Sequence, residues 1–219
     1  MVRGAACGFP VQETEARVTS PIEKSRQYVQ LHPLVLIGLM GAGKSSIGRR
    51  LAAALDLPFA DADAEIEKAA GKTINEIFEE NGEAYFRDGE RRVIARLLKE
   101  GGKVLATGGG AFMNEETRQR IAETGISVWL KADLDLLMSR VVRRDNRPLL
   151  RAEDPRGVME KLIADRYPVY ELADITILSR EVPHHLIVDE IIEAVAACTK
   201  CASMSKTGGN GLKGPETTC

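Results

Sequence analysis

Short apolar runs alternate along the chain with longer segments in which apolar residues recur every three or four positions. A short apolar run bounded by turn residues predicts a buried strand, and the longer periodicity predicts an amphipathic helix. Regular alternation of the two is typical of parallel strands joined by helices. We therefore expect an α/β fold, a three-layer α/β/α sandwich with a five-stranded parallel sheet. The expected strands cover residues 34–37, 57–60, 104–107, 127–130 and 175–178.

Helices are expected between these strands. Thr73 and Glu76 have the spacing of a capping box that opens a helix, and Asn81-Gly82 is expected to interrupt it. Residues 1–33 and 199–219 show no sustained periodicity, so we expect two disordered tails around one domain at 34–198. A further helix contains Ile66, and the remaining expected helices cover 43–55, 82–99, 114–123, 133–145, 155–171 and 184–197.

Composition narrows the class of protein. Thirty basic and 32 acidic residues leave a net charge of -2, so no overall field draws the chain to nucleic acid or to an anionic membrane. No apolar run approaches the ~20 residues that cross a bilayer, and the first thirty residues contain no signal-peptide core, so we expect a cytoplasmic protein. The cysteines lie outside residues 34–192, and we interpret the Cys198-x-x-Cys201 pair as surface thiols rather than a redox or zinc site.

A phosphate-binding loop follows the first expected strand. Residues 38–45 have the pattern G-x-x-x-x-G-K-S between a strand and an amphipathic helix, which is the context that this motif requires. Its glycines let consecutive backbone N–H groups point inward, and the start of the helix adds its positive dipole end. We expect nucleotide contacts from Gly41, Ala42, Gly43, Lys44, Ser45 and Ser46, with Lys44 on the β- and γ-phosphates and the Ser45 hydroxyl on Mg²⁺.

Two absences limit what the nucleotide is used for. The sequence contains no N-K-x-D motif for reading guanine, and no apolar strand ends in the Asp-Glu pair typical of ATP-driven motors. The remaining class is that of small nucleoside and metabolite kinases, in which the fold closes over two small substrates.

Two carboxylates follow the second expected strand. Asp61 and Asp63 are at alternate positions near the carboxyl edge of the sheet, where a parallel sheet places ligand-facing residues. We assign Asp61 to the water shell of Mg²⁺ and Asp63 to proton abstraction from the attacking hydroxyl. The alternative is that one of them only caps the helix containing Ile66.

The other candidate residues favour an acidic acceptor. Arg87 and Arg166 lie on separate expected helices, and arginine binds a carboxylate through two parallel hydrogen bonds. Gly108, Gly109 and Gly110 end the third strand and bring backbone N–H groups close to a ligand. Each arginine taken singly is more often a solvated or ion-paired surface residue, and a plain flexible loop is the alternative for the glycines.

Five arginines form a basic ridge further along the chain. We interpret them as part of a lid at about residues 145–156, with Arg147 neutralising the charge that develops during transfer. A nucleic-acid patch is the rival interpretation, but the ridge is short and lacks aromatic residues. The ridge consists of Arg140, Arg143, Arg144, Arg147 and Arg151.

In order along the chain, these motifs are G-L-M-G-A-G-K-S, D-A-D, F-R, T-G-G-G, R-P-L-L and R-Y-P-V-Y. With them the sequence closely resembles the shikimate kinases over almost all of residues 34–197. Ser46 departs from the threonine usual in that family, and both tails exceed the common length. The resemblance implies a monomeric kinase with a nucleoside monophosphate kinase-like fold, which transfers the γ-phosphate of ATP to the 3-hydroxyl of shikimate with one Mg²⁺ ion.

The resemblance also implies individual roles. Asp63, Arg87, Arg166 and the three glycines 108–110 would bind shikimate, with Asp63 as base and the two arginines on its carboxylate. Arg147 would reach ATP from the lid, and the adenine would lie between Arg140 and Pro183. Two alternatives stay open, a kinase of another small hydroxy acid such as gluconate, and a nucleotide-binding module without turnover.

Overall fold

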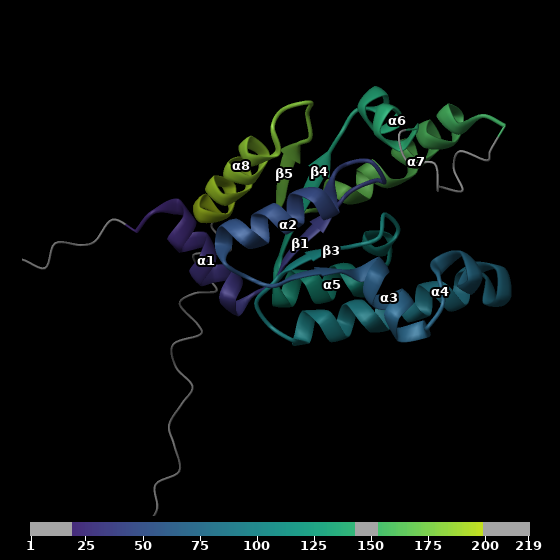
Figure 1. Cartoon of the computed structure of the whole chain (residues 1–219), viewed down its shortest axis with the longest axis horizontal. Coiled ribbons are helices and arrows are strands. Elements are labelled where there is room, and N and C mark those ends of the chain that lie inside the picture. Colours follow the sequence, from purple (N-terminus) through teal and green to yellow (C-terminus); the bar gives the residue numbers. More distant parts are fainter. Residues whose placement is uncertain (1–18, 143–152, 199–219) are drawn as a thin grey trace, which may run out of the picture.

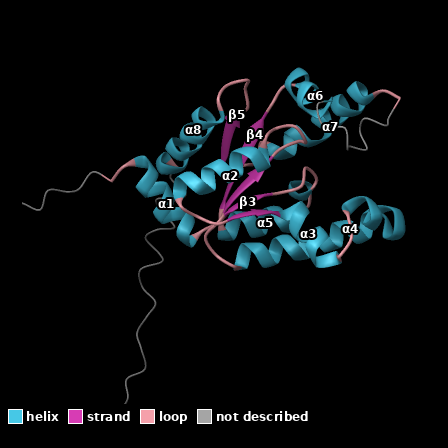
Figure 2. Ribbon diagram, viewed as in Figure 1, coloured by secondary structure: helices cyan, strands magenta, loops and turns pink. Residues whose placement is uncertain are grey.

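The computed structural model describes residues 19–142 and 153–198, which form a sheet with helices on both faces (Figures 1 and 2). All neighbouring strands are parallel, in the order β2-β3-β1-β4-β5. The predicted α/β class and the five-stranded parallel sheet are thus confirmed. The strands are β1 (Leu34–Ile37), β2 (Phe59–Asp61), β3 (Val104–Ala106), β4 (Ile126–Lys131) and β5 (Ile175–Leu178).

The helices fall close to their predicted positions, apart from one at the N-terminus. Helices α2 and α8 contact each other and cover one face of the sheet, while α5 contacts α4 and the strand β4. Among the described residues no helix is long and apolar enough to cross a membrane. The helices are α1 (Pro21–Leu31), α2 (Lys44–Leu55), α3 (Ala62–Ala70), α4 (Ile74–Lys99), α5 (Glu115–Thr124), α6 (Leu134–Val142), α7 (Pro155–Tyr170) and α8 (His184–Ala197), with a 3₁₀ turn, η1, at Ala111–Met113.

The central strand fixes the position of the phosphate loop. All four side chains of β1 are buried, as expected for a strand that is covered on both faces. Helix α2 packs closely on the sheet at Gly48, where an added Cβ would lie 2.6 Å from the Phe59 ring and 3.0 Å from Leu36. A larger residue at Gly48 would therefore push the helix, and the loop that leads into it, away from β1.

Helices α3 and α4 carry a small core of their own. It consists of Ile66, Ile77 and Phe86, separate from the main core. The predicted capping box is present, because Thr73 Oγ1 accepts from the Glu76 N–H and the Glu76 carboxylate accepts from the Thr73 N–H. Gly82 interrupts α4 with a φ of 78°, as the sequence predicts. This interruption lies five residues before Arg87, so α4 changes direction shortly before that residue.

The prediction of disorder over residues 1–33 is wrong for Pro21–Leu31, which form helix α1. Ser20 and Glu23 make a capping box, and Pro21 occupies the first helical position. Tyr28 and Val29 are buried, and helix α1 packs against α8. The contact with α8 supplies the apolar environment that the helix lacks by itself. Residues 1–18 and 199–219 lie outside the described residues.

Candidate active site

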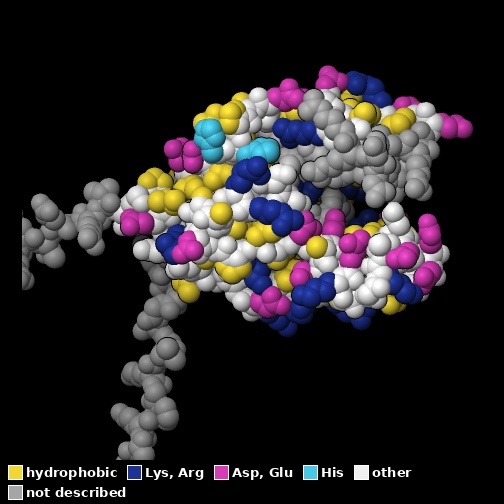
Figure 3. Space-filling view, in the orientation of Figure 1, with side chains coloured by type: hydrophobic (Ala, Val, Ile, Leu, Met, Phe, Trp, Pro, Cys, Tyr) yellow, Lys and Arg dark blue, Asp and Glu magenta, His cyan; other side chains and the backbone are white. Residues whose placement is uncertain are grey.

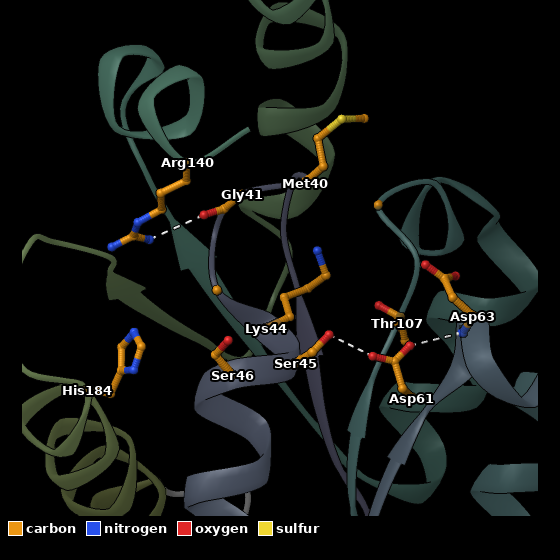
Figure 4. Close-up of a pocket in the computed structure, with 12 residues that line it drawn as sticks. Met40, Gly41, Lys44, Ser45, Ser46, Asp61, Asp63, Thr107, Arg140 and His184 are labelled. Carbon is orange, nitrogen blue, oxygen red and sulfur yellow. Dashed lines mark hydrogen bonds between the residues drawn. The ribbon is translucent and has the colours of Figure 1, made fainter. Parts of the chain in front are cut away.

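A cavity of about 380 Å³ opens at the carboxyl edge of the sheet (Figure 4). Lys44 and Ser45 line its middle, Asp63 lines one end, and Arg140 and His184 line the other. The space-filling view shows Lys and Arg side chains mixed with Asp and Glu side chains beside a hollow in this face of the molecule (Figure 3). The cavity therefore brings together residues that the sequence separates by as many as 144 positions, since Met40 and His184 both line it.

The phosphate loop leaves β1 with left-handed glycines. Gly38, Gly41 and Gly43 have φ values of 141°, 85° and 99°, a region that side chains strongly disfavour. At Gly38 an added Cβ would also lie only 2.8 Å from the Leu130 carbonyl oxygen. Gly43 is the N-cap of α2 and provides no side-chain cap, so the first N–H groups of the helix face the cavity as donors for an anion.

Lys44 and Ser45 open helix α2 beside this loop. Lys44 Nζ donates to the carbonyl oxygens of Gly38 (2.8 Å) and Leu39 (3.0 Å), which holds the ammonium group across the mouth of the loop. Ser45 Oγ donates to Asp61 Oδ2 at 2.6 Å. The loop and the end of β2 thus meet through one hydroxyl–carboxylate pair.

Asp61 combines the two roles that the sequence left open. Its Oδ1 accepts from the Asp63 N–H at 3.2 Å, so it caps helix α3, while its Oδ2 faces Ser45. A hydroxyl and a carboxylate oxygen this close suit a Mg²⁺ ion, which in phosphoryl-transfer sites takes one or two protein oxygens and completes its shell with water and phosphate. The described residues contain no cluster of three or more His, Cys, Asp or Glu side chains that would hold a metal without such a co-ligand.

Asp63 lies in the first turn of α3 at the acceptor end of the cavity. Burial, reinforced by the neighbouring charge of Asp61 and opposed by Lys44, raises its pKa from 3.8 to about 6. A carboxylate with this pKa is still ionised at neutral pH, yet it is a better proton acceptor than an ordinary aspartate. The electrostatics of the site therefore favour Asp63 as a general base.

The two predicted acceptor arginines flank the glycines after β3. An added Cβ at Gly109 would lie 3.2 Å from Arg166 Nη1, and one at Gly110 would lie 2.4 Å from Arg87 Nη1. Arg87 reaches the loop from α4 and Arg166 reaches it from α7, so the fold brings together two helices that the sequence separates by 79 positions. The arrangement places two guanidinium groups and consecutive backbone N–H groups around one small pocket.

Glu90 is a member of this site that the sequence analysis missed. Its Oε2 accepts from Arg87 Nη1 at 2.8 Å, while its Oε1 has no hydrogen-bond partner among the described residues, although the side chain is almost fully buried. That free oxygen would lie 2.7 Å from a Cβ at Gly108. The three-residue spacing from Arg87 on one helix was the available signal.

Tyr170 is a second residue that was missed. Its phenol is fully buried and donates to the Gly109 carbonyl oxygen, which ties the glycine loop to the end of α7. Burial raises the pKa of Tyr170, against the opposing effect of the Arg166 guanidinium, so the phenol remains a donor. The ring packs edge-on against Trp129 at 5.9 Å and Phe112 at 6.4 Å.

At the other end of the cavity, Arg140 braces the phosphate loop. Its guanidinium donates to Ser179 Oγ (2.9 Å) and to the Arg180 carbonyl oxygen (2.9 Å), and more weakly to the Gly41 carbonyl oxygen (3.3 Å). Pro183 is the N-cap of α8, and the next residue, His184, lines the cavity. Arg143, Arg144, Arg147 and Arg151, with the lid up to residue 152, lie outside the described residues.

The fold and the site together define a phosphotransferase of the phosphate-loop class. The phosphate loop and Asp63 line one cavity at the carboxyl edge of a parallel sheet, and Arg87 and Arg166 line a second pocket. The consecutive residues Gly109 and Gly110 line the first and the second of these pockets. The family model described as shikimate kinase matches residues 40–196, and the chain belongs to the shikimate kinase family.

Similarity to individual shikimate kinases supports this family assignment. A shikimate kinase of Rhodopseudomonas palustris is 64% identical over 163 residues, which cover 74% of this chain and 80% of the relative. A shikimate kinase of Brucella canis is 58% identical over 175 residues, covering 80% of this chain and 88% of the relative. Among solved structures, the shikimate kinase of Acinetobacter baumannii in complex with shikimate aligns with a TM-score of 0.72 at 34% identity, covering 85% of this chain and 99% of the other.

Proposed function

We infer that this protein is a shikimate kinase, which transfers the γ-phosphate of ATP to the 3-hydroxyl of shikimate and yields shikimate 3-phosphate and ADP. The reaction belongs to the synthesis of chorismate and the aromatic amino acids. The observation that carries this inference is that two pockets adjoin at Gly109 and Gly110, one lined by the phosphate loop and Asp63 and the other by Arg87 and Arg166. Family membership over residues 40–196 then favours shikimate over other hydroxy acids.

We assign the nucleotide half of the site to the phosphate loop. The N–H groups of residues 41–46 surround the β- and γ-phosphates, and Lys44 Nζ exchanges its bonds with the loop carbonyls for bonds to the phosphates. Ser45 and Asp61 hold one Mg²⁺ ion, whose positive charge neutralises the phosphate oxygens when it is bound. Pro183 and Arg140 flank the adenine, and Arg147 stabilises the charge on the transferring group.

The acceptor half binds the acid and activates its hydroxyl. Arg87 and Arg166 hold the carboxylate by charge-assisted hydrogen bonds, and Gly108 to Gly110 supply backbone N–H groups. Fixing the carboxylate in this way orients the ring, so that one hydroxyl faces Asp63. Asp63 then accepts the hydroxyl proton as the oxygen attacks phosphorus in line with the departing ADP.

An ADP-release assay with matched acceptors tests this function. We expect turnover with ATP, Mg²⁺ and shikimate, and none above background with gluconate or without an acceptor. Turnover with gluconate but not with shikimate would refute the substrate while leaving the kinase class intact. ATP binding without transfer to either acceptor would favour the non-catalytic alternative.

The proposal includes the setting in which the enzyme works. We propose that it acts as a monomer in the cytoplasm, because the two substrate pockets lie within a single chain. Sedimentation velocity in the presence and absence of both substrates checks the oligomeric state, and a dimer that forms with substrate bound would contradict it.

A further inference from the structure

His184 lies at the end of the cavity that is remote from the acceptor pocket. It is the first residue of α8, half-buried, and it lines the same cavity as Ser46 and Arg140. Figure 4 shows its imidazole ring on one side of Lys44, with Asp61 and Asp63 on the other side. Neither the phosphate loop motif nor the acceptor residues account for an imidazole at this position.

The orientation of a bound nucleotide determines which part of it His184 can contact. This step rests on the proposed function, since it takes the γ-phosphate to face the acceptor hydroxyl at Asp63. The phosphates occupy the loop around Lys44, so the nucleoside has to extend away from Asp63, toward Arg140 and His184. The imidazole is therefore placed beside the nucleoside rather than beside the transferring phosphate.

The charges around the ring agree with a contact to an uncharged group. Partial burial lowers the pKa of His184, and the positive charges of Arg50 on α2 and Arg140 on α6 lower it further. Arg50 is held close by through its hydrogen bond to the Ser46 carbonyl oxygen (2.8 Å). A neutral imidazole presents a flat ring with one donor and one acceptor nitrogen, which suits a purine or a ribose hydroxyl better than a phosphate.

We propose that His184 is a nucleoside-binding residue of the ATP site, which contacts the adenosine part of the nucleotide and not its phosphates. It lies next to Pro183, so the start of α8 supplies two consecutive residues to this subsite. The chain offers a matched control at the following position, because His185 is exposed on the same helical turn and does not line the cavity.

Calorimetric titrations of the full-length protein test the proposal with two ligands, MgATP and Mg²⁺ tripolyphosphate. The contact predicts that His184→Ala weakens MgATP binding by roughly 3- to 10-fold, the range expected for one stacking contact, and leaves tripolyphosphate binding unchanged. His185→Ala should leave both affinities unchanged. The KM for shikimate should also stay at the wild-type value in His184→Ala.

Two results would overturn the proposal. One is MgATP binding by His184→Ala within twofold of the wild type, and the other is an equal loss for MgATP and tripolyphosphate, which would place the ring at the phosphates. His184→Gln, a smaller disturbance of the helix start, repeats the comparison if the alanine variant fails to fold. Because these titrations contain no acceptor, they remain decisive even if the wild-type protein does not phosphorylate shikimate.

Discussion

Removing the Tyr170 hydroxyl should weaken shikimate binding without affecting ATP. The phenol donates to the Gly109 carbonyl oxygen, which lies in the loop between the two acceptor arginines. In Tyr170→Phe the ring keeps its edge-on contacts with Trp129 and Phe112, so the loss is confined to the polar contacts of the hydroxyl, with the Gly109 carbonyl oxygen and the Arg166 guanidinium. That loss leaves the partly buried carbonyl oxygen of Gly109 without its phenol donor.

The expected magnitude follows from this geometry. An unsatisfied buried acceptor costs about 1–3 kcal/mol, part of which is seen as lower stability and part as greater freedom of the glycine loop. If about 1–2 kcal/mol falls on the loop, the KM for shikimate rises roughly 5- to 30-fold while the Kd for MgATP is unchanged. Steady-state kinetics at saturating ATP and calorimetry with MgATP measure the two effects separately.

Tyr167→Phe is the matched control. Its phenol is also on α7 and in the same aromatic cluster, but it donates to the Ala132 carbonyl oxygen rather than to the glycine loop. We expect it to lose stability without a comparable rise in the KM for shikimate. If the two variants raise this KM equally, Tyr170 acts only through general packing and the positioning role is refuted.

The other predictions concern the base, the lid and the N-terminal helix. Asp63→Asn should lower kcat at least ~100-fold with unchanged MgATP affinity, and a near-normal rate would exclude the base role. In the wild type, kcat/KM should rise with pH through about 6, because the Asp63 carboxyl, whose pKa is raised to that value, loses its proton there. The folded state binds this proton more tightly than the unfolded state, so ionised Asp63 destabilises the fold at pH 8. Asp63→Asn should therefore have a higher Tm than the wild type at pH 8, and the difference in Tm should disappear below pH ~4. Arg147→Lys should slow transfer because a point charge cannot reproduce a planar fork at the phosphates, and unchanged single-turnover rates would remove Arg147 from the site. Tyr28→Ala should reduce the free energy of unfolding by about 3 kcal/mol with unchanged KM values, because it leaves a cavity where α1 packs against α8. Urea denaturation that shows no loss of stability would contradict that packing.

The sheet and most helices could be predicted from the sequence because their signals are local. The four apolar residues of β1, the capping box at Thr73 and the break at Gly82 each depend on residues within a few positions of one another. Helix α1 has local signals too, the Ser20 capping box among them. Its apolar face is short, however, and its stability depends on α8, more than 150 positions away in the sequence. That non-local contact is why a segment with helix signals was predicted to be disordered.

The candidate site divides in the same way. Asp61 ends β2, and Lys44 and Ser45 begin the helix after the loop that leaves β1, so the rule that ligands bind at the carboxyl edge of a parallel sheet locates them. Glu90 and His184 belong to no phosphate-loop motif and do not lie at the end of a strand. Their importance comes from what lies opposite them, the Arg87 guanidinium in one case and the nucleotide cavity in the other. Sequence patterns identify the groups that belong to a ligand-binding motif. They miss groups whose surroundings form only in the folded chain, as the glycine loop beside Glu90 and the cavity beside His184 do.

The glycines after β3 show why this part of the site has so little sequence freedom. Gly108 leaves room for the carboxylates of Asp63 and Glu90, because a Cβ there would lie 2.8 Å from one and 2.7 Å from the other. A Cβ at Gly110 would meet Arg87 at 2.4 Å, closer than any real contact allows. The absence of side chains therefore does more than let backbone N–H groups approach a ligand, since it also lets a base, a buried carboxylate and an arginine converge on the same loop. Any larger residue would have to displace one of the groups that we assign to acceptor binding.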